Sequence, residues 1–242
     1  MKKLVNIIKF LGLISLIIFL YAFSAKRNAA RPIKKIHVKF VGETRPFINE
    51  TMVNKLLIQN QGRATNVGKE TLALNSIEDR LMSEDVIAKV DVYRSVNAIL
   101  TTKIQQRTPI ARVNAATPFY IDEEGVTMSL SENYTARVPM VYNVQKDDVA
   151  EIHQLLQEVL QDDFLKHYVV AITKIGVNDY TLAVREHDFG IRFGGVKNSK
   201  KKIKNFKAFY QNALKDQSLG SYKSVNLRYS NQVVCIRKEV KN

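Results

Sequence analysis

Residues 88–106 read AKVDVYRSVNAILTTKIQQ, and this stretch decides the fold of the first folded part of the chain. Ala88, Val90 and Val92 alternate with polar or aromatic residues, which is the period of a strand that buries one face. After a break at Asn97, residues 99–106 again have the character of a strand. The stretch therefore predicts two neighbouring strands, and the other elements of their domain must come from the sequence before them.

The preceding sequence supplies a third strand and two helices. Residues 36–40 alternate in the same way, and Asn49 can cap a following amphipathic helix. Asn75 followed by Glu78 has the spacing of a capping box at the start of a second helix. The order strand, helix, helix, strand, strand predicts a small sheet with two helices on one face.

The N-terminus carries a long apolar stretch. Residues 4–23 contain one charge, Lys9, and twenty helical residues rise about 30 Å, the thickness of a hydrocarbon core. We predict a membrane-spanning helix with its core at residues 10–25, after a short cytoplasmic N-terminus at residues 1–9. A cleaved signal peptide, with its cleavage site at residues 22–24, is the alternative. Basic residues lie on both sides of the stretch, and they orient a long exported domain only weakly.

A second domain is predicted after Pro109. The boundary separates residues 33–109 from residues 110–242. Two amphipathic helices are expected there, at residues 148–160 and 198–214. Strands are expected at residues 119–121, 168–175, 180–185, 189–193, 224–229 and 232–238. The predicted fold class is α+β: an N-terminal transmembrane helix, a small βααββ domain, and a mainly antiparallel β domain with two helices.

The net charge indicates the classes of partner that the chain attracts, and the cysteine content excludes two kinds of structural site. The formal net charge of +14 draws the chain to polyanions, which include nucleic acid, an anionic bilayer and an acidic protein. Five lysines between residues 200 and 207 have the pattern of a solvated helix face or of a contact for an acidic partner. The single cysteine, Cys235, excludes an internal disulfide and a multi-cysteine zinc site, and its apolar neighbours indicate a small buried residue.

Motifs for chemistry are not found in the sequence. The four histidines lack metal-binding spacing, and the chain has neither a phosphate-binding glycine loop nor a G-x-S-x-G nucleophile motif. We therefore expect no catalytic, cofactor-binding or metal site.

An ordered set of short motifs resembles the FtsQ/DivIB family of cell-division proteins. The motifs are residues 36–42 (IHVKFVG), 90–94 (VDVYR), 100–104 (LTTKI), 106–111 (QRTPIA), 120–125 (YIDEEG), 138–139 (VP) and 225–231 (VNLRYSN). Gln106 stands where the family usually has glutamate, and Asn226 stands where it has aspartate. Each motif is short, but together and in order after one N-terminal span they are specific.

The resemblance implies a POTRA-like domain at residues 33–109 and a β domain at residues 110–242. It further implies a non-enzymatic scaffold of the divisome that binds FtsB- and FtsL-like proteins and links them to septal peptidoglycan synthesis. The expected location is the inner membrane at the septum, with one span, a cytoplasmic N-terminus and a periplasmic bulk. No cofactor, nucleic acid or small-molecule substrate is expected.

The last strand is the expected binding site, because a terminal strand often lies at a sheet edge that can accept another strand. In the family, FtsB adds to the sheet through this region. The predicted partner-binding residues are Arg228, Tyr229, Ser230, Asn231, Val233 and Cys235. The alternative is that Tyr229 packs on the sheet and Arg228 is solvated.

Three other functions stay open from the sequence. A membrane-anchored nucleic-acid or other polyanion binder would explain the positive charge. A POTRA-bearing chaperone would explain the first domain, and an extracytoplasmic hydrolase with an unrecognised site would explain export.

Overall fold

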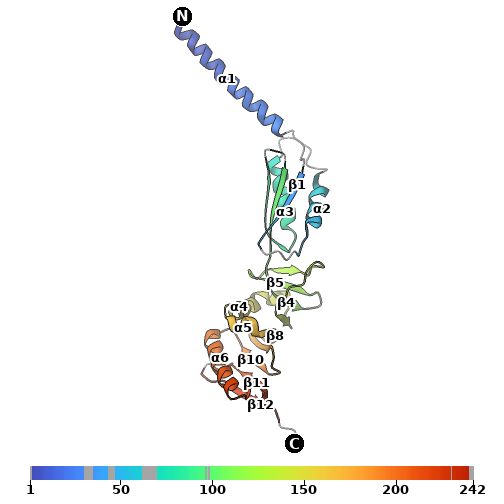
Figure 1. Ribbon diagram of the computed structural model, residues 1–242, viewed down its shortest axis with the longest axis vertical. Helices are drawn as coiled ribbons and strands as arrows, with labels where there is room; N and C mark the ends of the chain where they lie inside the picture. The colour runs from blue at the N-terminus through green and yellow to red at the C-terminus, as the bar shows by residue number, and fades with distance from the viewer. Residues whose placement is uncertain are drawn as a thin grey trace. The chain divides into compact units, whose positions relative to one another are not determined.

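The chain divides into two compact units, Met1–Gln106 and Arg107–Asn242 (Figure 1). The computed structural model describes residues 2–29, 35–42, 47–61, 70–95, 97, 99–229 and 231–239. The division falls between residues 106 and 107, close to the boundary expected after Pro109.

Unit 1 begins with the long apolar helix. Helix α1 spans Lys2–Ala29, and its segment Asn6–Arg27 has a mean hydropathy of 2.3 with none of it buried. Its 22 residues correspond to about 33 Å of helix, so α1 is long and apolar enough to cross a bilayer. Its place near the N-terminus is also compatible with a signal sequence.

The remaining elements of unit 1 follow the predicted order. They are β1 (Lys35–Val41), α2 (Glu50–Gln61), α3 (Glu70–Met82), β2 (Ile87–Arg94) and β3 (Ile99–Gln106). Strand β3 lies in the middle of the sheet, parallel to β1 and antiparallel to β2. Alternate side chains of the three strands are buried or half-buried, and both helices contribute buried residues such as Val53 and Leu81. The other face of the sheet carries the exposed side chains.

Two predicted helix-capping groups, one for α2 and one for α3, had different outcomes. Asn49 caps α2 as predicted, because its Oδ1 accepts a hydrogen bond from the Met52 N–H at 2.8 Å. The capping box predicted at Asn75 and Glu78 is wrong, since α3 already begins at Glu70. The Glu78 carboxylate instead accepts the Val92 N–H at 2.6 Å and so ties α3 to β2.

Unit 2 is built on one nine-stranded sheet. Its strands are β4 (Pro109–Asn114), β5 (Phe119–Asp122), β6 (Thr127–Ser129), β7 (Met140–Tyr142), β8 (Val169–Gly176), β9 (Asp179–Val184), β10 (Gly190–Gly194), β11 (Tyr222–Asn226) and β12 (Val234–Arg237). Their order is β12-β11-β10-β9-β8-β7-β4-β5-β6. Three neighbouring pairs are parallel and the other five are antiparallel, as a mainly antiparallel domain requires.

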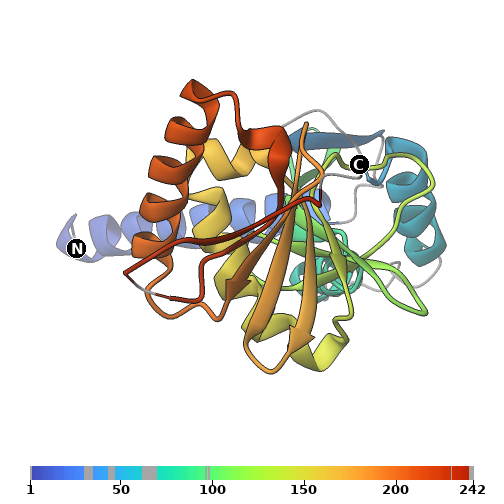
Figure 2. The same ribbon diagram turned by 90° about the horizontal axis from the view of Figure 1, so that it is seen from below.

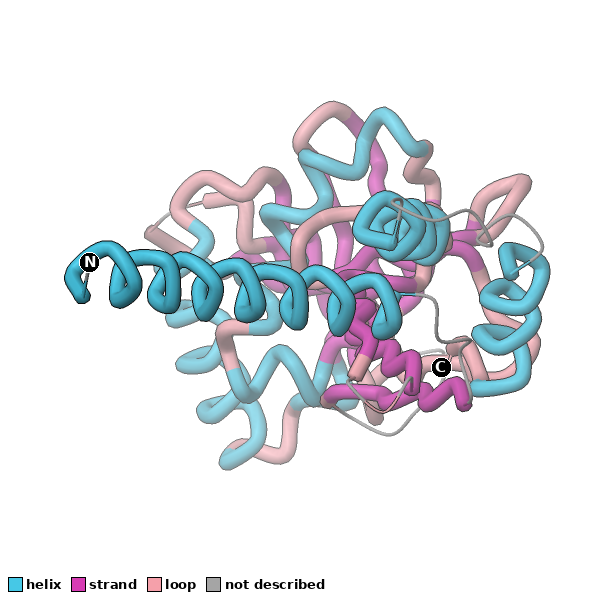
Figure 3. Tube along the Cα trace, turned by 90° about the horizontal axis from the view of Figure 1, so that it is seen from above, coloured by secondary structure: helices cyan, strands magenta, loops and turns pink. Residues whose placement is uncertain are grey.

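Helices α4 (Val149–Leu160), α5 (Asp163–Tyr168) and α6 (Ser199–Lys215) pack with this sheet; Figure 2 shows α6 beside the strands, and Figure 3 distinguishes helices from strands by colour. Two short 3-10 turns, Lys146–Asp148 and Leu219–Ser221, precede α4 and β11. The predicted apolar stripe of α4 is buried. Buried residues of α4, α6 and the strands form one continuous core. Helix α5 is a third helix, which the sequence did not indicate.

A buried carboxylate fixes the start of unit 2. Asp122, 2% exposed, accepts the N–H groups of Glu124 at 3.0 Å and Val126 at 2.7 Å, and its other oxygen lies 2.7 Å from Arg107 Nη1. Gly125 completes the turn with a φ of +80°, which glycine adopts without strain. Gln106, at the end of unit 1, uses its Oε1 to accept the Phe47 N–H at 2.7 Å.

Candidate partner-binding edge

Strand β12 lies at one end of the nine-stranded sheet. It pairs antiparallel with β11, and within the described part of the chain no strand pairs with its other side. Helix α6 connects β10 to β11, and these two strands run parallel. The terminal strand therefore occupies a sheet edge, as the sequence predicted. The opposite edge is β6, which has only three residues.

The backbone of β12 presents hydrogen-bonding groups outward. The Lys238 N–H donates to the Ser221 carbonyl at 2.8 Å, so this N–H points toward β11. Because the direction of N–H groups alternates along a strand, the N–H and C=O groups of Cys235 and Arg237 point away from β11. These groups can receive an added strand.

The side chains of β12 alternate between the core and solvent. Val233 and Cys235 are partly buried and pack against the core of unit 2. Val234 and Ile236 point the other way, with 38% and 58% of their surfaces exposed. Two of the predicted contact residues therefore turn their side chains inward, while the two outward-facing residues were missed. Burial also raises the pKa of the Cys235 thiol, which opposes thiolate formation.

Arg228 and Tyr229 lie outside the strand in which they were predicted. Strand β11 ends at Asn226, whose Oδ1 accepts the Arg228 N–H at 3.0 Å. Asparagine favours such a turn because its side chain bonds to the backbone two residues later. The expected strand over residues 224–229 is thus too long, and both residues belong to the connection to β12.

The Arg228 side chain makes its contacts within unit 2. Its side chain covers Gly194, where an added Cβ would lie 2.7 Å from Arg228 Cγ. Its guanidinium lies 4.0 Å from the Asp179 carboxylate, and 38% of the side chain is exposed. Arg228 is therefore a structural residue with a partly accessible charged end.

The rest of the predicted contact set lies in the same connection. Tyr229 is 48% exposed, so about half of its surface is accessible to a partner. The Asn231 Oδ1 accepts a hydrogen bond from Lys201 Nζ at 2.7 Å, which ties the connection to the first turn of α6. Ser230 lies outside the described residues.

The lysines of α6 do not form a uniform solvated face. Lys202 is only 6% exposed, and its Nζ donates to the Phe193 carbonyl at 2.9 Å and the Gly195 carbonyl at 2.6 Å. Its ammonium also lies 4.9 Å from the centroid of the Phe193 ring. Burial lowers the pKa of Lys202, although the charge of Asp179 acts in the opposite direction. Lys202 thus anchors α6 to the end of β10.

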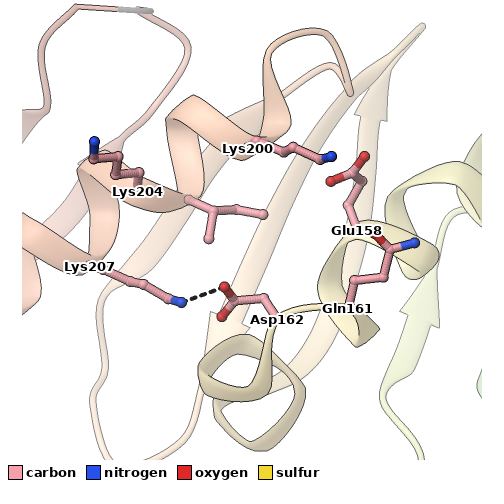
Figure 4. A pocket seen from close by; sticks show the side chains of 7 residues that line it. Glu158, Gln161, Asp162, Lys200, Lys204 and Lys207 are labelled. Carbon is pink, nitrogen blue, oxygen red and sulfur yellow. Dashed lines mark hydrogen bonds and ion pairs between the residues drawn. The ribbon is translucent and has the colours of Figure 1, made fainter.

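Three other lysines of α6 lie around a cavity of about 290 Å³ between this helix and the end of α4 (Figure 4). Lys207 forms an ion pair with Asp162, Lys200 points toward Glu158, and Lys204 points away from the cavity. The cavity also includes Gln161 and Ile203. Of these three lysines, Lys207 is the one with an ion pair in the described part of the chain.

Comparison with known proteins identifies the family. A family model described as FtsQ/DivIB, C-terminal related, matches residues 108–236, which is more than half of the chain and includes β4 to β12 except for the end of β12. No curated protein matches the chain significantly. The chain belongs to the FtsQ/DivIB-related family, and its role lies in cell division.

Proposed function

We propose that the protein is a membrane-anchored, non-enzymatic scaffold of the divisome that binds FtsB- and FtsL-like proteins and couples them to septal peptidoglycan synthesis. The observation that supports this most directly is the open edge of β12, with one neighbouring strand and outward apolar side chains at Val234 and Ile236. A partner strand would gain main-chain hydrogen bonds from the edge and apolar contact from these two residues. Helix α1 would anchor the chain in the inner membrane.

The unit-1 topology is that expected of a POTRA-like domain, and we propose that it and the β domain occupy the periplasm. The N-terminus before α1 is then cytoplasmic. A periplasmic reporter enzyme fused after Gln106 and, separately, before α1 tests this orientation. Activity of the first fusion alone supports the proposal, and activity of only the second contradicts it.

Proline substitutions on neighbouring residues test strand addition. Arg237→Pro removes an N–H that points outward, so it should leave the β11–β12 pairing intact and weaken capture of an FtsB-like partner. Ile236→Pro is the matched control, because its N–H points toward β11 and its loss should disturb the fold. Arg237→Ala separates the loss of charge from the loss of the N–H. Partner binding by Arg237→Pro equal to that of the parent protein would exclude main-chain pairing at β12.

The POTRA-type chaperone and the polyanion binder remain the competing proposals. A fluorescent fusion distinguishes them from a divisome scaffold, because a ring at midcell during constriction supports division. Uniform envelope staining argues for one of the other two. Salt-dependent binding of the purified chain to DNA or RNA would favour the polyanion binder.

A further inference from the structure

The sheet of unit 1 has one face that its own helices do not cover. Side chains on this bare face alternate with the buried ones along all three strands. The bare face is formed by Lys35, His37, Lys39, Val41, Lys89, Asp91, Tyr93, Thr101, Lys103 and Gln105. Four of these are lysines and one is an aspartate, so the bare face is positively charged.

The lysines are brought together by the register of the strands. Lys39 pairs with Lys103 across β1 and β3, while Asp91 pairs with Lys103 from the other side. Lys39, Lys89 and Lys103 all line a shallow hollow of about 550 Å³ on this face. Among the described residues, none of these three lysines has an acidic group within ion-pair distance.

Repulsion among these lysines makes the arrangement less favourable, and an external anion would relieve it. Lys39 and Lys103 lie opposite one another on neighbouring strands and repel each other, although Asp91 on the other side of Lys103 offsets part of this repulsion. The Lys103 ammonium lies 5.3 Å from the centroid of the Tyr93 ring, which offsets only part of the repulsion. An external layer of negative charge would stabilise the bare face.

We propose that the bare face of unit 1 binds the anionic headgroups of the bilayer in which α1 is inserted. The inference goes beyond partner binding by β12 but rests on the membrane anchor of the proposed function. Only residues 30–34 separate α1 from β1, so β1 begins within about 20 Å of the end of α1. This tether holds the lysines at a high effective concentration near the headgroups.

The composition of the bare face also fits a lipid surface better than an acidic protein. Tyr93 and Val41 are 43% and 47% exposed among the lysines. Tyrosine prefers the headgroup level of a bilayer, and exposed aliphatic groups can enter the boundary with the acyl chains. The last turn of α1 adds Lys26 and Arg27, so positive charge continues from the helix toward the sheet.

Fluorescence quenching in lipid nanodiscs tests the proposal with the full chain. A dye is attached to Gln105→Cys in a Cys235→Ser background, and the discs contain a lipid with a quencher on its headgroup. A second probe at Thr51→Cys, on exposed α2, reports the helical side of unit 1. We compare discs of phosphatidylcholine alone with discs that contain 30% phosphatidylglycerol.

We expect quenching at Gln105→Cys, but not at Thr51→Cys, in the anionic discs, and its loss at high salt. The variant Lys39→Gln, Lys89→Gln, Lys103→Gln should weaken docking about fivefold for each lysine removed. Its matched control, Lys55→Gln, Lys166→Gln, Lys215→Gln, removes the same charge from exposed sites elsewhere and should dock normally.

Equal quenching in neutral and anionic discs, equal quenching at the two probes, or equal losses in the two triple variants would each overturn the proposal. Failure of the membrane anchor itself is distinguishable, because the chain would then not co-purify with the discs. A hydrogen-exchange measurement on unit 1 of each variant confirms that its sheet is intact, so that a loss of docking is not a loss of folding.

Discussion

The alternation of side chains along β12 makes a quantitative prediction for partner binding. Ile236 is 58% exposed. Full burial of an isoleucine side chain stabilises a complex or a fold by about 1.5–3 kcal/mol. A partner strand that covers the exposed part would therefore gain about 1–2 kcal/mol from this residue. Ile236→Ala should raise the Kd by roughly 5- to 30-fold. Because this side chain is already largely in water, we expect its truncation to change the free energy of unfolding by less than about 0.5 kcal/mol.

Cys235→Ala provides the matched comparison on the neighbouring residue. Its side chain packs against the core, so the substitution should destabilise unit 2 and leave the outer surface of β12 unchanged. The Kd can be measured by interferometry between the full chain in detergent and the extracytoplasmic segment of an FtsB-like partner. Hydrogen exchange of β11 and β12 measures stability in the same samples. If Cys235→Ala weakens binding while Ile236→Ala does not, the assignment of the two faces is refuted.

Three further predictions concern the framework that supports the edge. Gly194→Ala should destabilise unit 2 by about 1–3 kcal/mol, because φ is +71° and the new Cβ would meet a side-chain carbon at 2.7 Å. Gly190→Ala, with open space around it, is the control in urea unfolding. Asp122→Ala removes three hydrogen bonds and should cost about 3 kcal/mol, measured as faster hydrogen exchange in β5 and β6; unchanged exchange would contradict this. The hydrogen bond from Lys174 lowers the pKa of Glu151, so its stabilising effect is complete above about pH 4.3 and disappears as the pH falls through the lowered pKa. Lys174→Met should reduce the difference between urea midpoints at pH 7 and pH 3, and an unchanged difference would show that this pair is not responsible.

Unit 1 was largely predictable from the sequence because its strands are long enough to show a period. Apolar or small residues alternate with other residues through three cycles in residues 35–40 of β1 and 88–93 of β2. In unit 2, β6 and β7 have three residues each, which is too few for a period to be distinguished. Strand β7 also pairs with strands distant in sequence, β4 and β8, whereas β6 pairs with its neighbour β5.

The position of β12 at a sheet edge was predicted, but which of its side chains point outward was not. Residues 233–236 are all apolar, so the sequence gives no alternation from which to decide whether Cys235 or Ile236 points inward. The choice is made by pairing, since Cys235 lies opposite the fully buried Val225. The premature end of β11 did have a signal, because Asn226 is a residue type that often begins a turn.

The position of Lys202 could not be predicted from a run of similar lysines. A lysine side chain can bury its aliphatic stem while its ammonium reaches polar groups, so charge alone does not determine exposure. Here the two carbonyls at the end of β10 supply those groups. They become available only through the packing of α6 against β10.

The pairing pattern of unit 1 also sets an order of events during folding. Among the described residues β1 and β2 each pair only with β3, which is the last of the three strands to be synthesised. Strand β1 must therefore wait unpaired until a strand about sixty residues later has been synthesised, whereas β2 and β3 are joined by a short connection. Closing the shorter loop costs less entropy, so the β2–β3 hairpin should form first and then capture β1. A chain halted between β2 and β3 would leave both earlier strands without a sheet to join.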